Sequence, residues 1–232
     1  MRIIYRISDT GYNKVKPDYI TNENCLANAT KEFDDVIWSV IADNVSSDTN
    51  DMIQKYVTRD CILYTEKGNG AATFNLALDE ALTYEDDETI YFIENDYLHK
   101  PGSQKTIQEA FELGADFVSL YDHPDKYVDG VNHYVEEGGE ITKVFLSKSC
   151  HWKLTNSTTM TFAAKVGTLK KYEYILRKYT STTHPDDFKM WVELRKQEAS
   201  LITPLPGYAT HGETAWLSPL NNWKKTSIWN KI

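Results

Sequence analysis

Short apolar segments alternate with amphipathic segments through the first half of the chain. The expected strands cover residues 2–7, 36–42, 61–64, 90–93 and 116–121, and the expected helices start near residues 22, 48, 70 and 104. Short apolar runs bounded by polar and turn-forming residues are typical of buried strands. Strands that alternate with helices in this way predict a mostly parallel sheet with right-handed crossovers.

The second half of the chain follows a different pattern. It predicts a hairpin with a Gly138-Gly139 turn, a further strand, two helices and a loop-rich tail, at residues 134–146, 158–163, 166–179, 185–199 and 203–232. The chain contains no internal repeat, low-complexity stretch or linker. We therefore expect one α/β domain, in which helices flank a mostly parallel central sheet and the hairpin adds a small antiparallel part.

Acidic residues follow several of the predicted strands. Asp43, Asp122 and the pair Glu94 and Asp96 all stand where a strand should leave the sheet. Residues two apart in an extended chain point to the same side, so Glu94 and Asp96 can share one cation or polar ligand. Carboxyl ends of parallel strands meet at one edge of a sheet, and carboxylates there suit Mg²⁺ or Mn²⁺. Taken alone, the tripeptide 94–96 also fits an ordinary polar end of a strand.

A second candidate feature is the Gly68-Asn69-Gly70 segment before a predicted helix. Glycines there allow a backbone to approach a diphosphate at the helix N-terminus. Such a segment is more often only a turn, and the lysine and hydroxyl residue of a Walker motif are missing.

Composition narrows the class of protein. With 25 basic and 34 acidic residues, the 232-residue chain has a formal net charge of −9, which argues against a nucleic-acid-binding protein. Cys25, Cys61 and Cys150 lack the spacing of a metal site, so we interpret them as reduced thiols of an intracellular protein. No segment is long and apolar enough to span a membrane, so a cytoplasmic location is expected.

The strand followed by Glu94-Asn95-Asp96 and then Tyr-Leu-His-Lys-Pro-Gly resembles the metal-binding DXD element of GT-A-fold glycosyltransferases, which use nucleotide-sugar donors. Other segments that resemble parts of this family are residues 5–9, 41–43, 68–75, 151–160, 185–187 and 210–213. The resemblance implies a single GT-A-like (Rossmann-like) domain over 1–232, with a nucleotide-binding half (1–125) and an acceptor-binding half (126–232). Glu94 departs from the family pattern, and this is tolerable if Asp96 is the main ligand and Glu94 contacts ribose or a metal-bound water.

The resemblance also implies roles for individual residues. Mn²⁺ or Mg²⁺ would be held by Asp96, His211 and Glu94, and the donor by Arg6, Ser8, Asp43, Asn69, Glu94 and Asn95. The acceptor would contact His151, Trp152 and Trp191, and Asp187, with Asp186 in reserve, would be the base. The expected activity is transfer of a sugar, with inversion, from a nucleoside-diphosphate donor of UDP type to a saccharide acceptor, in the synthesis of a surface glycan of bacterial or viral kind.

Each of these residues has a plainer interpretation. Asp186 and Asp187 lie in the first turn of a predicted helix, where acids are favoured by the helix dipole. His211 could be an ordinary loop residue, Asp43 could simply end a strand, and the tryptophans could pack in the core.

Two other functions stay open. A sugar nucleotidyltransferase would carry a glycine-rich loop with Arg and Lys after the first strand, which residues 8–14 do not supply. A non-catalytic nucleotide- or carbohydrate-binding module would not require both Asp187 and His211.

Overall fold

The structure is a computed structural model that describes residues 1–11 and 14–228, so the end of the predicted tail, 229–232, lies outside the described residues. The first half alternates strands and helices as predicted. Its elements are β1 (Arg2–Ser8), α1 (Asn22–Glu32), β2 (Ile37–Asp43), α2 (Ser47–Gln54), η1 (Arg59–Cys61), β3 (Ile62–Thr65), α3 (Gly70–Ala81), β4 (Thr89–Glu94), β5 (Tyr97–His99), α4 (Ser103–Glu112) and β6 (Phe117–Val118).

The second half is more irregular than the sequence predicted. Its elements are η2 (Pro124–Tyr127), β7 (Val135–Glu136), β8 (Gly139–Glu140), β9 (Val144–Leu146), β10 (His151–Leu154), β11 (Phe162–Lys165), α5 (Val166–Lys178), α6 (Asp187–Lys196), β12 (Leu201–Leu205), β13 (Ala209–His211), η3 (Thr214–Trp216) and α7 (Trp223–Ile228). A hairpin exists as β7 and β8, but β8 lies before the predicted second strand at 141–146. Only 144–146 of that predicted strand is a strand, β9, and it pairs with β10. Periodicity did not reveal β5, β10, β12 or β13, and the strand predicted at 158–163 lies at 162–165, as β11.

Strands from both halves of the chain join one sheet. Within the described residues this sheet has nine strands in the order β3-β2-β1-β4-β11-β6-β12-β10-β9. The pairings are parallel from β3 to β4 and between β6 and β12, and antiparallel at the other steps, so β11 and β10 run against the remaining strands. A mostly parallel sheet flanked by helices, with small antiparallel hairpins, is therefore confirmed.

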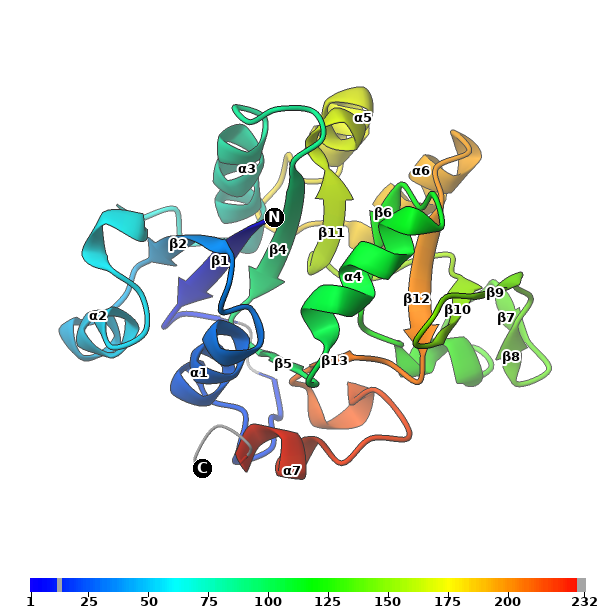
Figure 1. Ribbon diagram of the computed structural model, residues 1–232, viewed down its shortest axis with the longest axis horizontal. Coiled ribbons are helices and arrows are strands. Elements are labelled where there is room, and N and C mark those ends of the chain that lie inside the picture. The colour runs from blue at the N-terminus through cyan, green and yellow to red at the C-terminus, as the bar shows by residue number, and fades with distance from the viewer. Residues whose placement is uncertain (12–13, 229–232) are drawn as a thin grey trace.

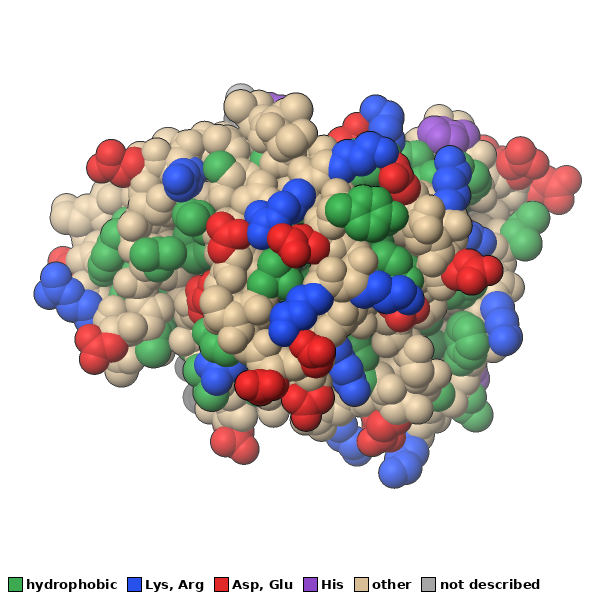
Figure 2. Space-filling model, turned by 90° about the horizontal axis from the view of Figure 1, so that it is seen from above, with side chains coloured by type: hydrophobic (Ala, Val, Ile, Leu, Met, Phe, Trp, Pro, Cys, Tyr) green, Lys and Arg blue, Asp and Glu red, His purple; other side chains and the backbone are tan. Residues whose placement is uncertain are grey.

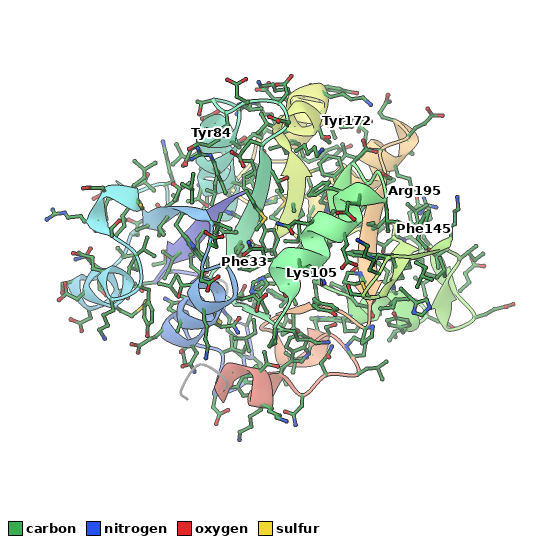
Figure 3. The ribbon with its side chains drawn as sticks, in the orientation of Figure 1. Phe33, Tyr84, Lys105, Phe145, Tyr172 and Arg195 are labelled. Carbon is green, nitrogen blue, oxygen red and sulfur yellow. The ribbon has the colours of Figure 1, made fainter. Side chains whose placement is uncertain are left out.

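Helices cover both faces of the sheet. One core cluster contains residues of α1, α2 and α4 against the strands, and includes Phe33, Ile53 and Ile107. The other contains residues of α3, α5 and α6, and includes Phe74, Leu176 and Trp191. Figure 1 shows α1 and α4 in front of the sheet, and Phe33 lies between α1 and β4, with its ring 5.4 Å from that of Tyr91 (Figure 3). This three-layer arrangement leaves the carboxyl edge of the sheet for loops.

The surface and the thiols agree with the composition. On the face shown in Figure 2, acidic and basic side chains are interspersed. Cys25, Cys61 and Cys150, all within the described residues, are free thiols. No helix in the described parts of the chain is long and apolar enough to cross a bilayer.

Candidate functional site

Asp96 and His211 lie side by side although 115 positions separate them in the chain. The short antiparallel pair β5–β13 joins them, with His211 opposite Tyr97, so that Asp96 stands immediately before one strand and His211 ends the other. His211 Nε2 lies 3.2 Å from Asp96 Oδ2, and 9% of each side chain is exposed. The next residue is Gly212, where a Cβ would approach the Asp96 carbonyl oxygen to 2.8 Å. A glycine is needed there because the two chain segments approach closely.

Two lysines from the segment after β1 contact this pair. Lys16 Nζ lies 3.0 Å from Asp96 Oδ2, and Lys14 Nζ lies 3.7 Å from the same oxygen and 2.9 Å from His211 Nε2. Burial on its own would raise the pKa of Asp96, but the neighbouring His211, Lys14 and Lys16 outweigh it and hold that pKa well below its usual range. Asp96 is thus an anion held among cationic and imidazole groups.

The donor atoms at Asp96 and His211 fit a divalent cation only with help from a ligand. A carboxylate oxygen and an imidazole nitrogen are both acceptable to Mn²⁺, and Mg²⁺ commonly uses one or two carboxylates together with substrate phosphates. No group of three or more His, Cys, Asp or Glu residues able to hold a metal occurs in the described parts of the chain. Two protein ligands plus phosphate oxygens would therefore complete the set.

Glu94 is engaged with Arg6 rather than with the Asp96–His211 pair. The two residues are opposite each other on β4 and β1, with Glu94 Oε1 3.2 Å from Arg6 Nη2. Arg6 also donates to the carbonyl oxygens of Gly70 at 3.0 Å and Met160 at 3.5 Å. Its side chain is only 5% exposed, so direct contact between Arg6 and a nucleobase does not fit the structure. Arg6 instead orients Glu94, whose own side chain is 30% exposed.

Two predicted donor residues shape the loop before α3. The carboxylate of buried Asp43 accepts the backbone N–H groups of Lys67 at 2.6 Å and Gly68 at 2.9 Å. Asn69 is the N-cap of α3, and its side chain accepts from Ala72 N at 2.8 Å. Both carboxylate oxygens of Asp43, which is 3% exposed, accept within the loop, so Asp43 positions this loop, and its direct contact with the donor stays a prediction. The predicted helix start at Gly70 is confirmed.

Ser8 and Asn95 lie at the adjoining ends of β1 and β4. Asn95 Nδ2 donates to the Ser8 carbonyl oxygen at 3.2 Å and to Asn22 Oδ1 at 2.7 Å. The Ser8 hydroxyl contacts Thr10 Oγ1 at 3.0 Å and is partly exposed. These contacts tie the loop after β1 to the loop that carries Asp96.

Asp122, the acid that follows β6, is engaged with a lysine and a tyrosine. Asp122 is 2% exposed and pairs with buried Lys153, whose Nζ lies 2.9 Å from Asp122 Oδ1. It also accepts from the Tyr127 hydroxyl at 2.7 Å. A lysine from β10 therefore neutralises the carboxylate that the sequence assigned to a shared cation edge.

Asp186 and Asp187 have different environments although they are adjacent. Asp186 is the N-cap of α6 and accepts from Lys189 N at 3.3 Å and Lys189 Nζ at 2.7 Å, so it has the capping role that the helix dipole favours. Asp187 is partly buried, and its Oδ1 accepts from Phe188 N at 2.7 Å. Burial raises the pKa of Asp187 to about 6, and the negative charge of Glu94 adds to the rise. The neighbouring Asp186 also raises the pKa of Asp187, whereas His211 lowers it slightly.

The predicted acceptor residues are not brought to Asp96. Trp152 has no exposed surface, and Trp191 is 2% exposed with its ring 5.0 Å from that of Phe162. Side chains buried in this way cannot stack on a saccharide, so both tryptophans serve the core. His151 is exposed at the start of β10. Because β10 is four positions from β4 in the sheet, His151 is on the order of 19 Å from the strand that leads to Asp96.

Lys14 and Lys16 were not predicted as site residues. Two lysines two positions apart, soon after the first strand, are a signal that sequence reasoning could use, because alternate residues of an extended segment face the same side. Their contact with a carboxylate far along the chain depends on tertiary structure.

Comparison with known proteins shows similarity of fold but not of sequence. No family model matches the chain, and no curated protein matches it by sequence. Among solved structures, 2-C-methyl-D-erythritol 4-phosphate cytidylyltransferase of Francisella tularensis has a TM-score of 0.52 and 11% identity, over 99% of this chain and 98% of that chain. A197 from STIV (TM-score 0.44, 14% identity, 88% of this chain and 81% of that chain) and the galactosyltransferase LgtC, in complex with donor and acceptor sugar analogs (0.45, 9%, 83% and 69%), are too distant to support an argument. The chain shares the α/β fold of the Francisella tularensis cytidylyltransferase, and the α/β fold class that the sequence predicted is confirmed.

Proposed function

We propose that the protein transfers a sugar from a nucleoside-diphosphate donor to a saccharide acceptor. The observation that carries this proposal is the meeting of Asp96 and His211 at 3.2 Å. Glycosyl transfer needs stabilisation of a departing diphosphate on one side of the sugar and a base for the acceptor on the other. The candidate site contains both kinds of group.

On the donor side, Asp96 and His211 would hold Mn²⁺ or Mg²⁺. When bound, such a cation supplies positive charge that stabilises the leaving diphosphate. Lys14 and Lys16 would turn their ammonium groups to the diphosphate oxygens, since an ammonium group on a flexible side chain readily changes partner. Glu94, oriented by Arg6, would accept a hydrogen bond from a hydroxyl group of the donor.

On the acceptor side, Asp187 would take the proton of the attacking hydroxyl. A pKa of about 6 leaves Asp187 ionised at neutral pH while keeping it more basic than an ordinary aspartate. Nucleophilic attack assisted by a base on the face opposite the leaving group inverts the anomeric centre, so inversion is part of the proposal.

A thermal-shift panel of nucleotide sugars, with and without Mn²⁺, tests the donor side. We expect at least one UDP-sugar to raise the melting temperature, and Mn²⁺ to enlarge the shift, because a ligand that binds only the folded state stabilises it. Slow release of UDP from that donor should follow in the same conditions. A panel in which no nucleotide sugar changes the melting temperature would contradict the proposal.

The contacts of Lys14 and Lys16 favour a second candidate, sugar nucleotidyl transfer. A basic segment after β1 that reaches Asp96 is where such an enzyme would hold the phosphates of a nucleoside triphosphate, and the solved cytidylyltransferase shares this fold. Product analysis separates the two reactions. Release of pyrophosphate from a nucleoside triphosphate and a sugar phosphate supports nucleotidyl transfer, whereas release of a nucleoside diphosphate from a nucleotide sugar supports glycosyl transfer.

A further inference from the structure

Three rings gather beside the candidate base Asp187. The ring of His133 lies 5.0 Å from that of Phe188 in an edge-on arrangement and 5.2 Å from that of Tyr134, and Tyr134 lies 6.1 Å from Phe188. We call His133, Tyr134 and Phe188 the aromatic shelf. His133 and Tyr134 are exposed, Tyr134 to 47%, and Phe188 is partly exposed. Three ring systems that remain in contact with solvent are thus available to a ligand.

Buried polar side chains fix the loop that carries two of these rings. Asn132 is 1% exposed, and its Oδ1 accepts from Tyr134 N at 3.0 Å and from Asn156 Nδ2 at 3.2 Å. Its Nδ2 donates to Asp125 Oδ2 at 2.9 Å. Lys126, also 1% exposed, contacts Asp125 at 2.8 Å and the Ser157 hydroxyl at 2.8 Å. Full pairing of buried polar groups holds a loop in one conformation, so the position of the shelf is set before a ligand arrives.

The chain segment that holds this loop also contacts the donor side of the site. Asn156 and Thr161 belong to one buried segment, in which Asn156 holds Asn132 and the Thr161 hydroxyl contacts Glu94 N at 3.1 Å and Glu94 Oε2 at 3.4 Å. Met160, in the same segment, accepts from Arg6. At the other end, Phe188 N donates to Asp187 Oδ1 at 2.7 Å. The shelf is therefore tied at one side to the candidate base and at the other to the Arg6–Glu94 pair.

We infer that the aromatic shelf binds the acceptor saccharide, an inference that rests on the function proposed above. A pyranose ring has an apolar C–H face that packs on an aromatic ring and hydroxyl groups at its edge that seek polar partners. Tyr134 and Phe188 offer ring surface, while the Tyr134 hydroxyl, His133 and the carboxylate of Asp187 offer hydrogen-bonding groups. This combination of ring faces and polar groups matches a sugar better than an apolar partner. The shelf would therefore have the acceptor-binding role that the sequence assigned to Trp152 and Trp191, which are buried.

The test separates acceptor binding from donor chemistry. Donor hydrolysis and transfer to a panel of methyl glycosides are measured for the wild type and for Tyr134→Ala, Phe188→Ala and Tyr134→Phe. The matched control is Tyr174→Ala, which removes a tyrosine that is 58% exposed on α5. We expect the acceptor KM to rise about tenfold in the two alanine variants, as for loss of one stacked ring, with donor hydrolysis unchanged. Tyr134→Phe keeps the ring, so it should retain most of the acceptor affinity, and Tyr174→Ala should match the wild type.

Saturation-transfer NMR with the same methyl glycosides, in the absence of donor, gives a second measurement. Signals from the C–H face of the sugar are expected with the wild type and should be lost with Tyr134→Ala, whose folding is checked by its melting temperature. If donor is hydrolysed but neither alanine variant changes the acceptor KM, the shelf is not the acceptor site. If saccharide binds through the shelf but no nucleotide sugar is hydrolysed, the shelf is a saccharide site, but its role as the acceptor site fails together with the glycosyltransferase function. Absence of both glycoside signals and donor turnover overturns both.

Discussion

Asp96 and Asp187 are both aspartates withdrawn from solvent in one candidate site, and their surroundings push their pKa values in opposite directions. Burial would raise both pKa values. At Asp96, His211, Lys14 and Lys16 reverse that effect, whereas at Asp187 the charge of Glu94 reinforces it. Two carboxyl groups with separated pKa values are suited to different tasks, a permanent anion for holding cations and a base for accepting a proton. The division of roles comes from neighbours, not from residue type.

The largest expected effect is on Asp187. Asp187→Asn keeps the size of the side chain but removes the base, so kcat for transfer should fall about 10²- to 10⁴-fold. Donor hydrolysis, in which water replaces the acceptor, should fall less. Asp186→Asn is the matched control. It removes the negative charge of Asp186 and keeps that of Asp187, and asparagine also caps helices well. Equal losses in the two variants would show that Asp187 has no separate role.

A smaller effect is expected at Asp96. Asp96→Asn removes the anion that His211, Lys14 and Lys16 contact, so nucleotide-dependent stabilisation should disappear and donor turnover should fall about 100-fold. Asp87→Asn serves as the control, since Asp87 is an exposed aspartate between α3 and β4. Donor turnover at the wild-type rate in Asp96→Asn would show that the phosphate site lies elsewhere.

The smallest effect is on stability, where the two aspartates should differ in sign. A raised pKa means that folding favours protonated Asp187, so this stabilisation is present below about pH 4 and is lost as the pH rises through about 6. Asp187→Asn should therefore be more stable than the wild type above pH 6, by on the order of 1–3 kcal/mol. The lowered pKa of Asp96 has the opposite consequence, because its stabilisation is present above about pH 4 and is lost in acid.

Urea unfolding of both variants between pH 2 and pH 8 measures this contrast. We expect Asp96→Asn to be less stable than the wild type above about pH 4, with the difference shrinking as the pH falls below 4. Stability differences from the wild type that change in the same direction with pH for the two variants would refute the comparison.

The rate of transfer should also depend on pH. It should fall about tenfold for each pH unit below 6, because only ionised Asp187 can act as base.

The sequence predicted correctly those strands whose burial produces a continuous apolar run along the chain. The apolar runs of β1, β4 and the second half of β2 are buried on both faces of the sheet, so they appear in the sequence as continuous hydrophobic segments. The short strands β10, β12 and β13 escaped notice because strands of three to five residues with polar or proline positions carry little periodic signal. Trp152 and Trp191 were assigned to an acceptor because residue type does not reveal burial.

The sequence by itself determined the α/β class, the alternation of the first half and the placement of Asp96 at the end of a buried strand, since these depend on neighbours along the chain. Only the tertiary structure decided that His211 meets Asp96, that Lys14 and Lys16 join them, and that Arg6 binds Glu94. It also decided that Asp187 and Asp96 have opposite pKa shifts. Such shifts depend on burial and on charges brought together by folding, and neither quantity can be read from the order of residues.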